Sequence, residues 1–203
     1  MDSIYRSAQE YKNLLPISYR FDFATKRRKV TIIELDFLKE DFFHICGLQH
    51  LDDIEIPRNR RKTLEYIDDG VITDELLKKA KKYYDIPKQE DSDIESRIEE
   101  ASRLKEYLET NNLIRIFSLK DAKASGKMIE ADYVIKSRLP NSYISVFIFL
   151  RKRKENDRYC VISFFKKKNN EYTGEALYWM MKTKINNNGE TVLFKHKNYN
   201  PDK

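Results

Sequence analysis

The chain has 203 residues, of which 40% are hydrophobic and 12% aromatic, and its formal net charge is +6. This length supports one sizeable core, or a core with a small subdomain, and the apolar content argues against an intrinsically disordered chain. Five glycines and five prolines exclude a loop-dominated scaffold. The 35% charged content exceeds the usual quarter, so we expect heavily charged surfaces.

The cysteines and the N-terminal residues indicate the cellular setting. Cys46 and Cys160 lie in apolar runs, which favours buried, reduced thiols over reactive ones. The N-terminus lacks the apolar core of a signal peptide, and the longest apolar run, YISVFIFL, is too short to span a bilayer as a helix. We therefore expect cytoplasmic localisation and no membrane partner.

The first half of the chain is predicted to be mainly helical. Residues 3–15 carry apolar side chains at helical spacing, and two apolar runs around ATKRRK then predict a β-hairpin. Thr73 caps a further helix. The segment KQEDSD is a candidate linker, and the capping-box pair Ser92 and Glu95 begins a helix through about Thr110.

The segment LDFLKEDFFHICGLQHL, Leu35 to Leu51, is predicted to be a central helix because its apolar side chains point almost all the way round. His44 projects into an apolar sector, and Gly47 either permits a close approach or ends the helix. His44 is therefore either a core histidine with satisfied ring nitrogens or a general acid or base. The residues that suit a solvent edge are Lys39, Glu40, Gln49 and His50.

From Asn112 onward the pattern predicts strands. Six candidates are LIRIFSL, ADYVIKSR, YISVFIFLRKR, YCVISFF, ALYWMMKTKI and ETVLFKH. YISVFIFL and YCVISFF are apolar on both faces, so we expect them to be adjacent and central. The fold class is therefore α+β, with an N-terminal hairpin and helices followed by a mostly antiparallel β-sheet. Residues 1–110 and 111–203 are the two parts of one integrated domain.

Charge is unevenly distributed along the chain. Between Arg151 and Lys168 eight basic residues face two acids, whereas from Asp85 to Glu100 seven acids face two basic residues. A second basic cluster, RNRRK at 58–62, is predicted to form a turn. This polarity indicates either a face for an anionic partner or solvated loops of a lysine-rich chain.

The central segment also resembles a known family. Its run F-x-x-x-x-F-x-H-x-x-G-L-x-x-L is similar to a phage-associated nuclease family, the fourth group named for barnase, EndoU, the colicin ribonucleases and RelE. ADYVIKSR (131–138) and SFFKKKNNEYTG (163–174) support the resemblance. It implies a helix-plus-sheet fold (BECR-like) and RNA cleavage without a metal ion.

The residues themselves are compatible with that chemistry. His44 and His50 are six positions apart on different sides of the predicted helix, and the remaining histidine is His196, so we expect no metal site and no cofactor. A basic sheet surface with one semi-buried histidine suits RNA cleavage, because the ribose 2′-hydroxyl supplies the nucleophile. RNA, including tRNA, is the expected partner.

Each candidate site residue has a stated role and an ordinary alternative. The candidate catalytic residues are His44 for proton transfer, and Lys136, Arg138 and Ser163 for the phosphate and the scissile group. The candidate substrate-binding residues are Arg151, Arg153, Tyr159, Lys166, Tyr172 and Lys182. Each cation is otherwise a surface charge, and Ser163 is otherwise a strand residue whose hydroxyl is satisfied locally.

Two non-enzymatic hypotheses remain open. One is a phage accessory or anti-defence protein whose basic rim binds nucleic acid, a protein inhibitor, or another phage or host protein. The other is a toxin- or immunity-type protein binder. A common cleft lined by His44, Ser163 and one of Lys136 or Arg138 favours the enzyme, whereas a His44 sealed in the core opposes it.

Overall fold

The computed structural model describes residues 2–85, 92–118, 129–140, 142–167, 172 and 174–201. The helices are α1 (Ser3–Lys12), α2 (Asp41–Ile45), α3 (Thr63–Asp68), α4 (Asp74–Leu77), α5 (Ile94–Ala101) and α6 (Leu104–Glu109). Three 3₁₀ turns are η1 (Leu48–His50), η2 (Arg60–Lys62) and η3 (Lys81–Tyr83). The strands are β1 (Ser18–Ala24), β2 (Val30–Leu35), β3 (Asn112–Ile116), β4 (Tyr133–Ser137), β5 (Ser145–Lys152), β6 (Tyr159–Lys167), β7 (Ala176–Asn186) and β8 (Gly189–Lys195).

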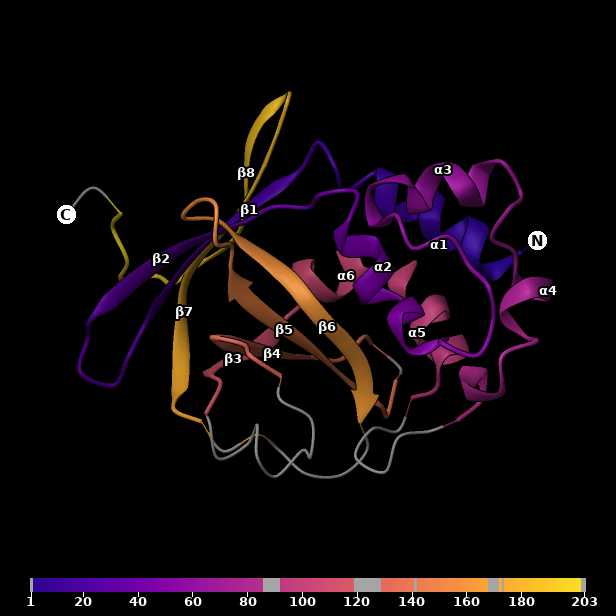
Figure 1. The fold of residues 1–203 in the computed structure, drawn as a ribbon. Helices are drawn as coiled ribbons and strands as arrows, with labels where there is room; N and C mark the ends of the chain where they lie inside the picture. The colour runs from indigo at the N-terminus through magenta and orange to yellow at the C-terminus, as the bar shows by residue number, and fades with distance from the viewer. Residues whose placement is uncertain are drawn as a thin grey trace.

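The strands form one sheet in the order β1-β2-β6-β5-β4-β3-β7-β8, and β1 also pairs with β7. This extra pairing closes seven strands into a barrel, from which the β7–β8 hairpin extends (Figure 1). The α+β class and the N-terminal hairpin are therefore as predicted. The hairpin is not separate from the sheet, however, because β1 joins it on both sides, and β2 meets β6 in a parallel pairing at Leu35 and Tyr159.

The two strands predicted to be adjacent, β5 and β6, pair along almost their whole length. They lie in the middle of the strand order and are apolar on both faces, as expected. One face contributes Ile148 and Phe164 to the main core. The opposite face contributes to a second cluster made of Phe117, Val134, Phe147, Phe149, Phe165 and Tyr172.

The helices gather on one side of the barrel, where they cover the main core (Figure 1). Helices α2 and α5 pack directly on β6, and α1 packs on α5. Phe42 and Ile45 of α2 and Ile98 of α5 are fully buried there. None of the helices in the described ranges is long and apolar enough to cross a membrane.

The predicted central helix is much shorter in the structure. Leu35 ends β2, α2 comprises only Asp41–Ile45, and Gly47 then adopts a left-handed conformation with φ 74°. A Cβ at this position would lie 2.8 Å from Ile94 Cδ1, so the glycine also permits close approach of α5. The predicted helix over 92–110 is likewise divided into α5 and α6. Most of the candidate linker and Lys168 lie outside the described residues.

Replacing Gly47 with alanine should destabilise the fold more than the same change at Gly70. Both glycines have positive φ, which costs an alanine about 1–2 kcal/mol of folding free energy. Only Gly47 adds a steric conflict, with Ile94 and Arg97, since an added Cβ at Gly70 would meet nothing within 4 Å. Urea denaturation of both variants measures the difference. Equal losses would show that the close approach to α5 carries no energetic weight.

Candidate active site

A cleft of about 1020 Å³ opens between α2, the η1 and η2 turns and the β5–β6 hairpin. Its lining combines two imidazoles with many cations and a few acids. The polar side chains that line it are His44, Gln49, His50, Arg60, Arg61, Arg97, Arg151, Lys152, Arg153, Lys154, Glu40, Asp41, Glu130, Glu155, Asn156 and Ser163. Guanidinium and ammonium groups outnumber the acids, so the charge of the cleft favours an anionic ligand.

His44 lies in the last turn of α2, at the border between core and cleft. Its neighbours Phe43 and Ile45 are buried in the core, whereas His44 is half-buried and lines the cleft. The helix begins at Asp41, whose Oδ2 accepts a hydrogen bond of 2.9 Å from the Leu38 backbone N–H. The apolar residues of α2 thus fix the helix on β6, and this placement leaves the imidazole accessible from the cleft.

Gly47 brings a second histidine to the same cleft. Its left-handed conformation turns the chain after α2 into η1, in which the His50 N–H donates to the Gly47 carbonyl at 3.0 Å. Leu48 of η1 is fully buried, which fixes the orientation of the turn. His50 therefore lines the cleft with His44, instead of lying on the solvent side that a continuous helix predicts.

Arg153 joins the β5–β6 hairpin to the start of α2. Its Nε donates to Asp36 Oδ1 at 2.7 Å, and its Nη1 and Nη2 donate to the two carboxylate oxygens of Asp41 at 3.1 and 2.5 Å. The side chain is only 7% exposed. Because both carboxylates occupy the guanidinium, we assign Arg153 to positioning α2 and not to binding substrate.

The environment of His44 favours its neutral form. Burial lowers the pKa of His44 below its ordinary value, and the charge of Arg60 lowers it further. Asp41 and hydrogen bonding to Gln49 act in the opposite direction, and Arg151 adds a smaller lowering. At neutral pH the imidazole is therefore unprotonated, which is the form that accepts a proton.

Two other predicted residues share the cleft with His44. Arg151, on β5, is 42% exposed, and its Nη1 lies 3.7 Å from the exposed carboxylate of Glu130. Such an ion pair is weak in water, so the guanidinium is available to an anionic ligand. Ser163, on β6, is half-buried and lies on the cleft wall. The structure thus brings His44, Arg151, Arg153 and Ser163 together.

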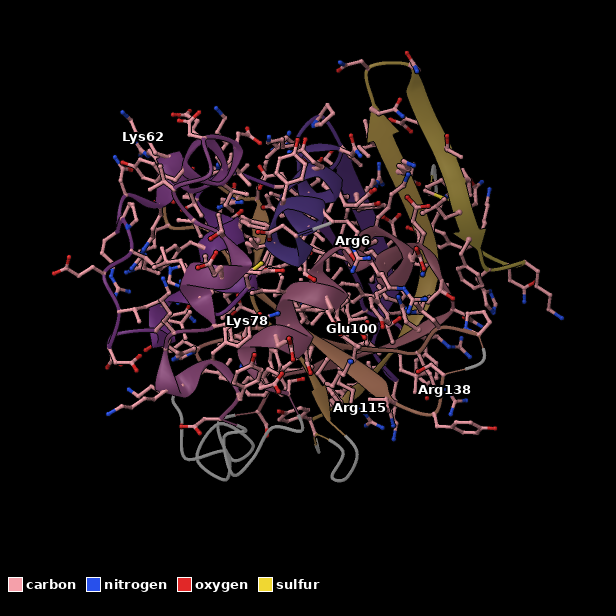
Figure 2. The ribbon with its side chains drawn as sticks, turned by 90° about the vertical axis from the view of Figure 1, so that its right-hand side faces the viewer. Arg6, Lys62, Lys78, Glu100, Arg115 and Arg138 are labelled. Atoms are coloured by element: carbon pink, nitrogen blue, oxygen red, sulfur yellow. The ribbon has the colours of Figure 1, made fainter. Side chains whose placement is uncertain are left out.

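Lys136 and Arg138 do not line this cleft. Lys136 lies on β4 opposite Phe147 of β5, and Arg138 follows the end of β4. Figure 2 shows Arg138 and Lys62 at opposite sides of the molecule, and Lys62 neighbours the cleft residue Arg61. The expected grouping of Lys136 or Arg138 with His44 and Ser163 is therefore not formed.

Three predicted substrate-binding residues lie elsewhere. Tyr172 is 5% exposed and packs edge-on against the rings of Phe117, Phe147 and Phe149, so it belongs to the second apolar cluster. The Tyr159 ring packs at 5.7 Å from the Tyr133 ring and does not line the cleft. The third residue, Lys166, pairs with the Glu100 carboxylate at 2.8 Å and is mostly covered.

Lys182 is a core residue and not a surface cation. It is 3% exposed, and its Nζ donates to the carbonyls of Leu108 and Thr110 at 3.3 and 2.7 Å. Burial lowers the pKa of Lys182 to about 8, against a smaller raising effect of Glu109. Helix α6 lies over this face of β7, where Lys184 also pairs with Glu109 at 3.1 Å.

The residue pattern does not single out several residues that line the cleft, among them Gln49, His50, Arg60, Arg61, Lys152 and Lys154. The basic cluster at 58–62 contains Arg60 and Arg61, but local sequence does not indicate that this cluster and His44 line the same cleft. A continuous helix over Leu35 to Leu51 would place His50 on the solvent side, so the helical pattern does not predict its position in the cleft.

Cys160 also lines the cleft, but burial raises its pKa to about 11, so its thiol is not an effective nucleophile at neutral pH. Within the described ranges, no group of three or more His, Cys, Asp or Glu side chains has a geometry suited to a metal ion.

Replacing Arg153 with methionine should destabilise the protein by about 3–5 kcal/mol, because the Asp36 and Asp41 carboxylates then lose their buried partner. The matched control is Arg103→Met, since Arg103 pairs with Glu106 but is 46% exposed and should cost less than about 1 kcal/mol. Chemical denaturation measures both. Similar small losses for the two variants would contradict the positioning role.

The buried Lys182 should give stability a distinct pH dependence. Below about pH 8 the Lys182 side chain is charged in both the folded and the unfolded protein, and its burial destabilises the folded state. Above its ordinary pKa of 10.5 the side chain is neutral in both the folded and the unfolded protein. The unfolding free energy of the parent relative to Lys182→Met should therefore rise between pH 8 and 10.5, by up to about 3 kcal/mol. Lys195→Met, at an exposed position on β8, should show no such rise. A flat difference for Lys182 would exclude the proposed penalty.

Comparison with known proteins adds one finding to this geometry. A family model described as phage-Barnase-EndoU-ColicinE5/D-RelE like nuclease4 matches residues 3–200, almost the whole chain. No curated protein and no solved structure matches the chain. The match spans α1 to β8 and so includes every residue of the cleft.

Proposed function

Because the chain belongs to the phage-Barnase-EndoU-ColicinE5/D-RelE like nuclease4 family, we propose that the cleft around His44 cleaves RNA without a metal ion. The observation that carries the proposal is the place of His44, half-buried on the wall of a cationic cleft and not sealed in the core. RNA is the proposed substrate class because its 2′-hydroxyl is an internal nucleophile. Such a reaction needs only a base, an acid and cations from the protein.

The proposed reaction starts with proton transfer to His44. The neutral imidazole takes the proton of the 2′-hydroxyl while the 2′-oxygen forms a bond to phosphorus. The bond between phosphorus and the 5′-oxygen then breaks, and that oxygen receives a proton. The products are a 2′,3′-cyclic phosphate and a free 5′-hydroxyl, with no oxidation or reduction.

We assign the stabilisation of the negative charge that develops on the phosphate to three arginines of the cleft, Arg60, Arg61 and Arg151. Arg61 Nε lies 3.7 Å from Glu40 Oε1, and Arg151 has a similarly long, exposed contact with Glu130. Exposed pairs of this length contribute less than about 1 kcal/mol, so a phosphate displaces the carboxylates at little cost. The planar guanidinium then binds two phosphate oxygens at once.

The remaining cleft wall suits a nucleobase beside the scissile phosphate. Ile129 and Ile162 supply an apolar surface, and the hydroxyl of Ser163, which lines the same cleft, offers both a donor and an acceptor. Lys152 and Lys154, on the β5–β6 hairpin, extend the positive charge along the rim toward neighbouring phosphates. The proposed substrate is therefore an RNA strand laid across the hairpin, and tRNA falls within this class.

Replacing His44 with glutamine should slow RNA cleavage by about 10²–10⁴-fold, because a positioned base is lost while a similar volume is kept. Labelled RNA incubated in EDTA measures the rate, and the affinity for RNA and the melting temperature should change little. The matched control is His196→Gln, since the His196 side chain is exposed and distant in sequence from the cleft. It should cut like the parent.

The pH profile gives an independent readout of the same site. Since the pKa of His44 is lowered by burial and Arg60, kcat/KM of the parent should rise with pH and level off below neutrality. His44→Gln should lose this rise.

The parent protein should not cleave a substrate that has one 2′-deoxynucleotide at the cleavage site. Cleavage of that substrate, or an unchanged rate for a folded His44→Gln protein, would overturn the proposal; binding without cleavage would favour a non-enzymatic RNA-binding protein.

A further inference from the structure

The cleft contains a second histidine that the reaction above leaves without a role. His50 follows Gly47 in the η1 turn and faces the same cleft as His44. The side chain is half-buried, so it is neither free in solvent nor sealed in the core. The hydrogen bond from its backbone N–H to the Gly47 carbonyl and the buried Leu48 hold the turn in place.

The Gln49 amide contacts the His50 imidazole and influences the pKa of His44. The Gln49 Nε2 atom lies 3.0 Å from His50 Nε2. Hydrogen bonding to Gln49 is also one of the influences that raise the pKa of His44. The Gln49 Oε1 atom is buried and has no hydrogen-bond partner of standard geometry in the described part of the chain. A carboxamide offers a donor at one end and an acceptor at the other, so by rotating it holds an imidazole in either protonation state.

In-line cleavage of RNA requires two separate proton-transfer groups. The attacking 2′-oxygen and the leaving 5′-oxygen lie on opposite sides of the phosphorus atom. One imidazole can therefore exchange a proton with only one of these oxygens during the displacement. A second group has to exchange a proton with the other oxygen. His50 is the other imidazole that lines this cleft, and an imidazole can both accept and donate a proton in such a reaction.

We propose that His50 is the general acid that protonates the leaving 5′-oxygen, while His44 accepts the proton of the 2′-hydroxyl. This inference rests on the proposed ribonuclease function. His50 enters the reaction protonated, gives one proton to the 5′-oxygen as the bond to phosphorus breaks, and leaves neutral. Gln49 lies within hydrogen-bond distance of one ring nitrogen, His50 Nε2, and so restrains the orientation of the ring.

A leaving group that needs no acid separates this role from a structural one. In an RNA with sulfur in place of the bridging 5′-oxygen at one site, the thiol that leaves has a pKa of about 8.5, as in cysteine, far below that of an alcohol. His50→Gln should cut ordinary RNA about 10²–10⁴-fold more slowly than the parent. It should cut the 5′-thio RNA within about tenfold of the parent rate. His44→Gln should stay slow on both substrates.

The controls distinguish the failure of this inference from that of the ribonuclease proposal. His196→Gln should cut both substrates like the parent, and His50→Ala should show the same rescue by sulfur as His50→Gln. A His50→Gln protein that cuts ordinary RNA normally, or that remains as slow on the 5′-thio RNA, overturns the role of His50 alone. A parent protein that cuts neither substrate in EDTA overturns the ribonuclease proposal instead.

Discussion

The guanidinium of Arg153, enclosed by the carboxylates of Asp36 and Asp41, is the interaction on which the geometry of the cleft depends. It ties three elements together: the end of β2, the start of α2 and the β5–β6 hairpin. Burying these charges costs desolvation energy, which the bidentate contact with Asp41 offsets. A short helix of five residues has little intrinsic stability, so its position has to come from such tertiary contacts. Because α2 carries His44, the ion cluster also determines where the imidazole lies relative to Arg151.

Closure of the barrel supports this arrangement from the other side. β1 pairs with both β2 and β7, and β2 meets β6 through a parallel pairing at Leu35. The Asp36 backbone N–H then donates to the Tyr159 carbonyl at 3.1 Å, so the chain leaves β2 directly against the start of β6. This path places Asp36 beside Arg153. The N-terminal hairpin therefore contributes to the site although none of its strand residues lines the cleft.

The electrostatics of the cleft follow from the same packing. Cations surround a half-buried imidazole, and both burial and Arg60 keep the pKa of His44 low. The arginines proposed to stabilise a developing negative charge thus also lower the pKa of the proposed base and favour its neutral form. Lys182 shows the contrast: it has a lowered pKa too, but carbonyl groups of the core surround it, so its perturbed pKa reflects structure and not a site.

The sequence alone determined the elements with strong local signals. Two-sided apolarity identified β5 and β6 as adjacent central strands, and the alternation around ATKRRK identified the β1–β2 hairpin, because side-chain periodicity reports which faces are buried. It also identified the family to which the chain belongs, and it predicts a site role for His44. Only the tertiary structure decided which cations accompany His44. Arg60, Arg61 and His50 reach the cleft through a left-handed glycine and a turn, whereas Lys136 and Arg138 lie away from it and Lys182 is buried. Helix boundaries and side-chain burial of this kind depend on contacts between residues far apart in the chain, which a local pattern does not encode.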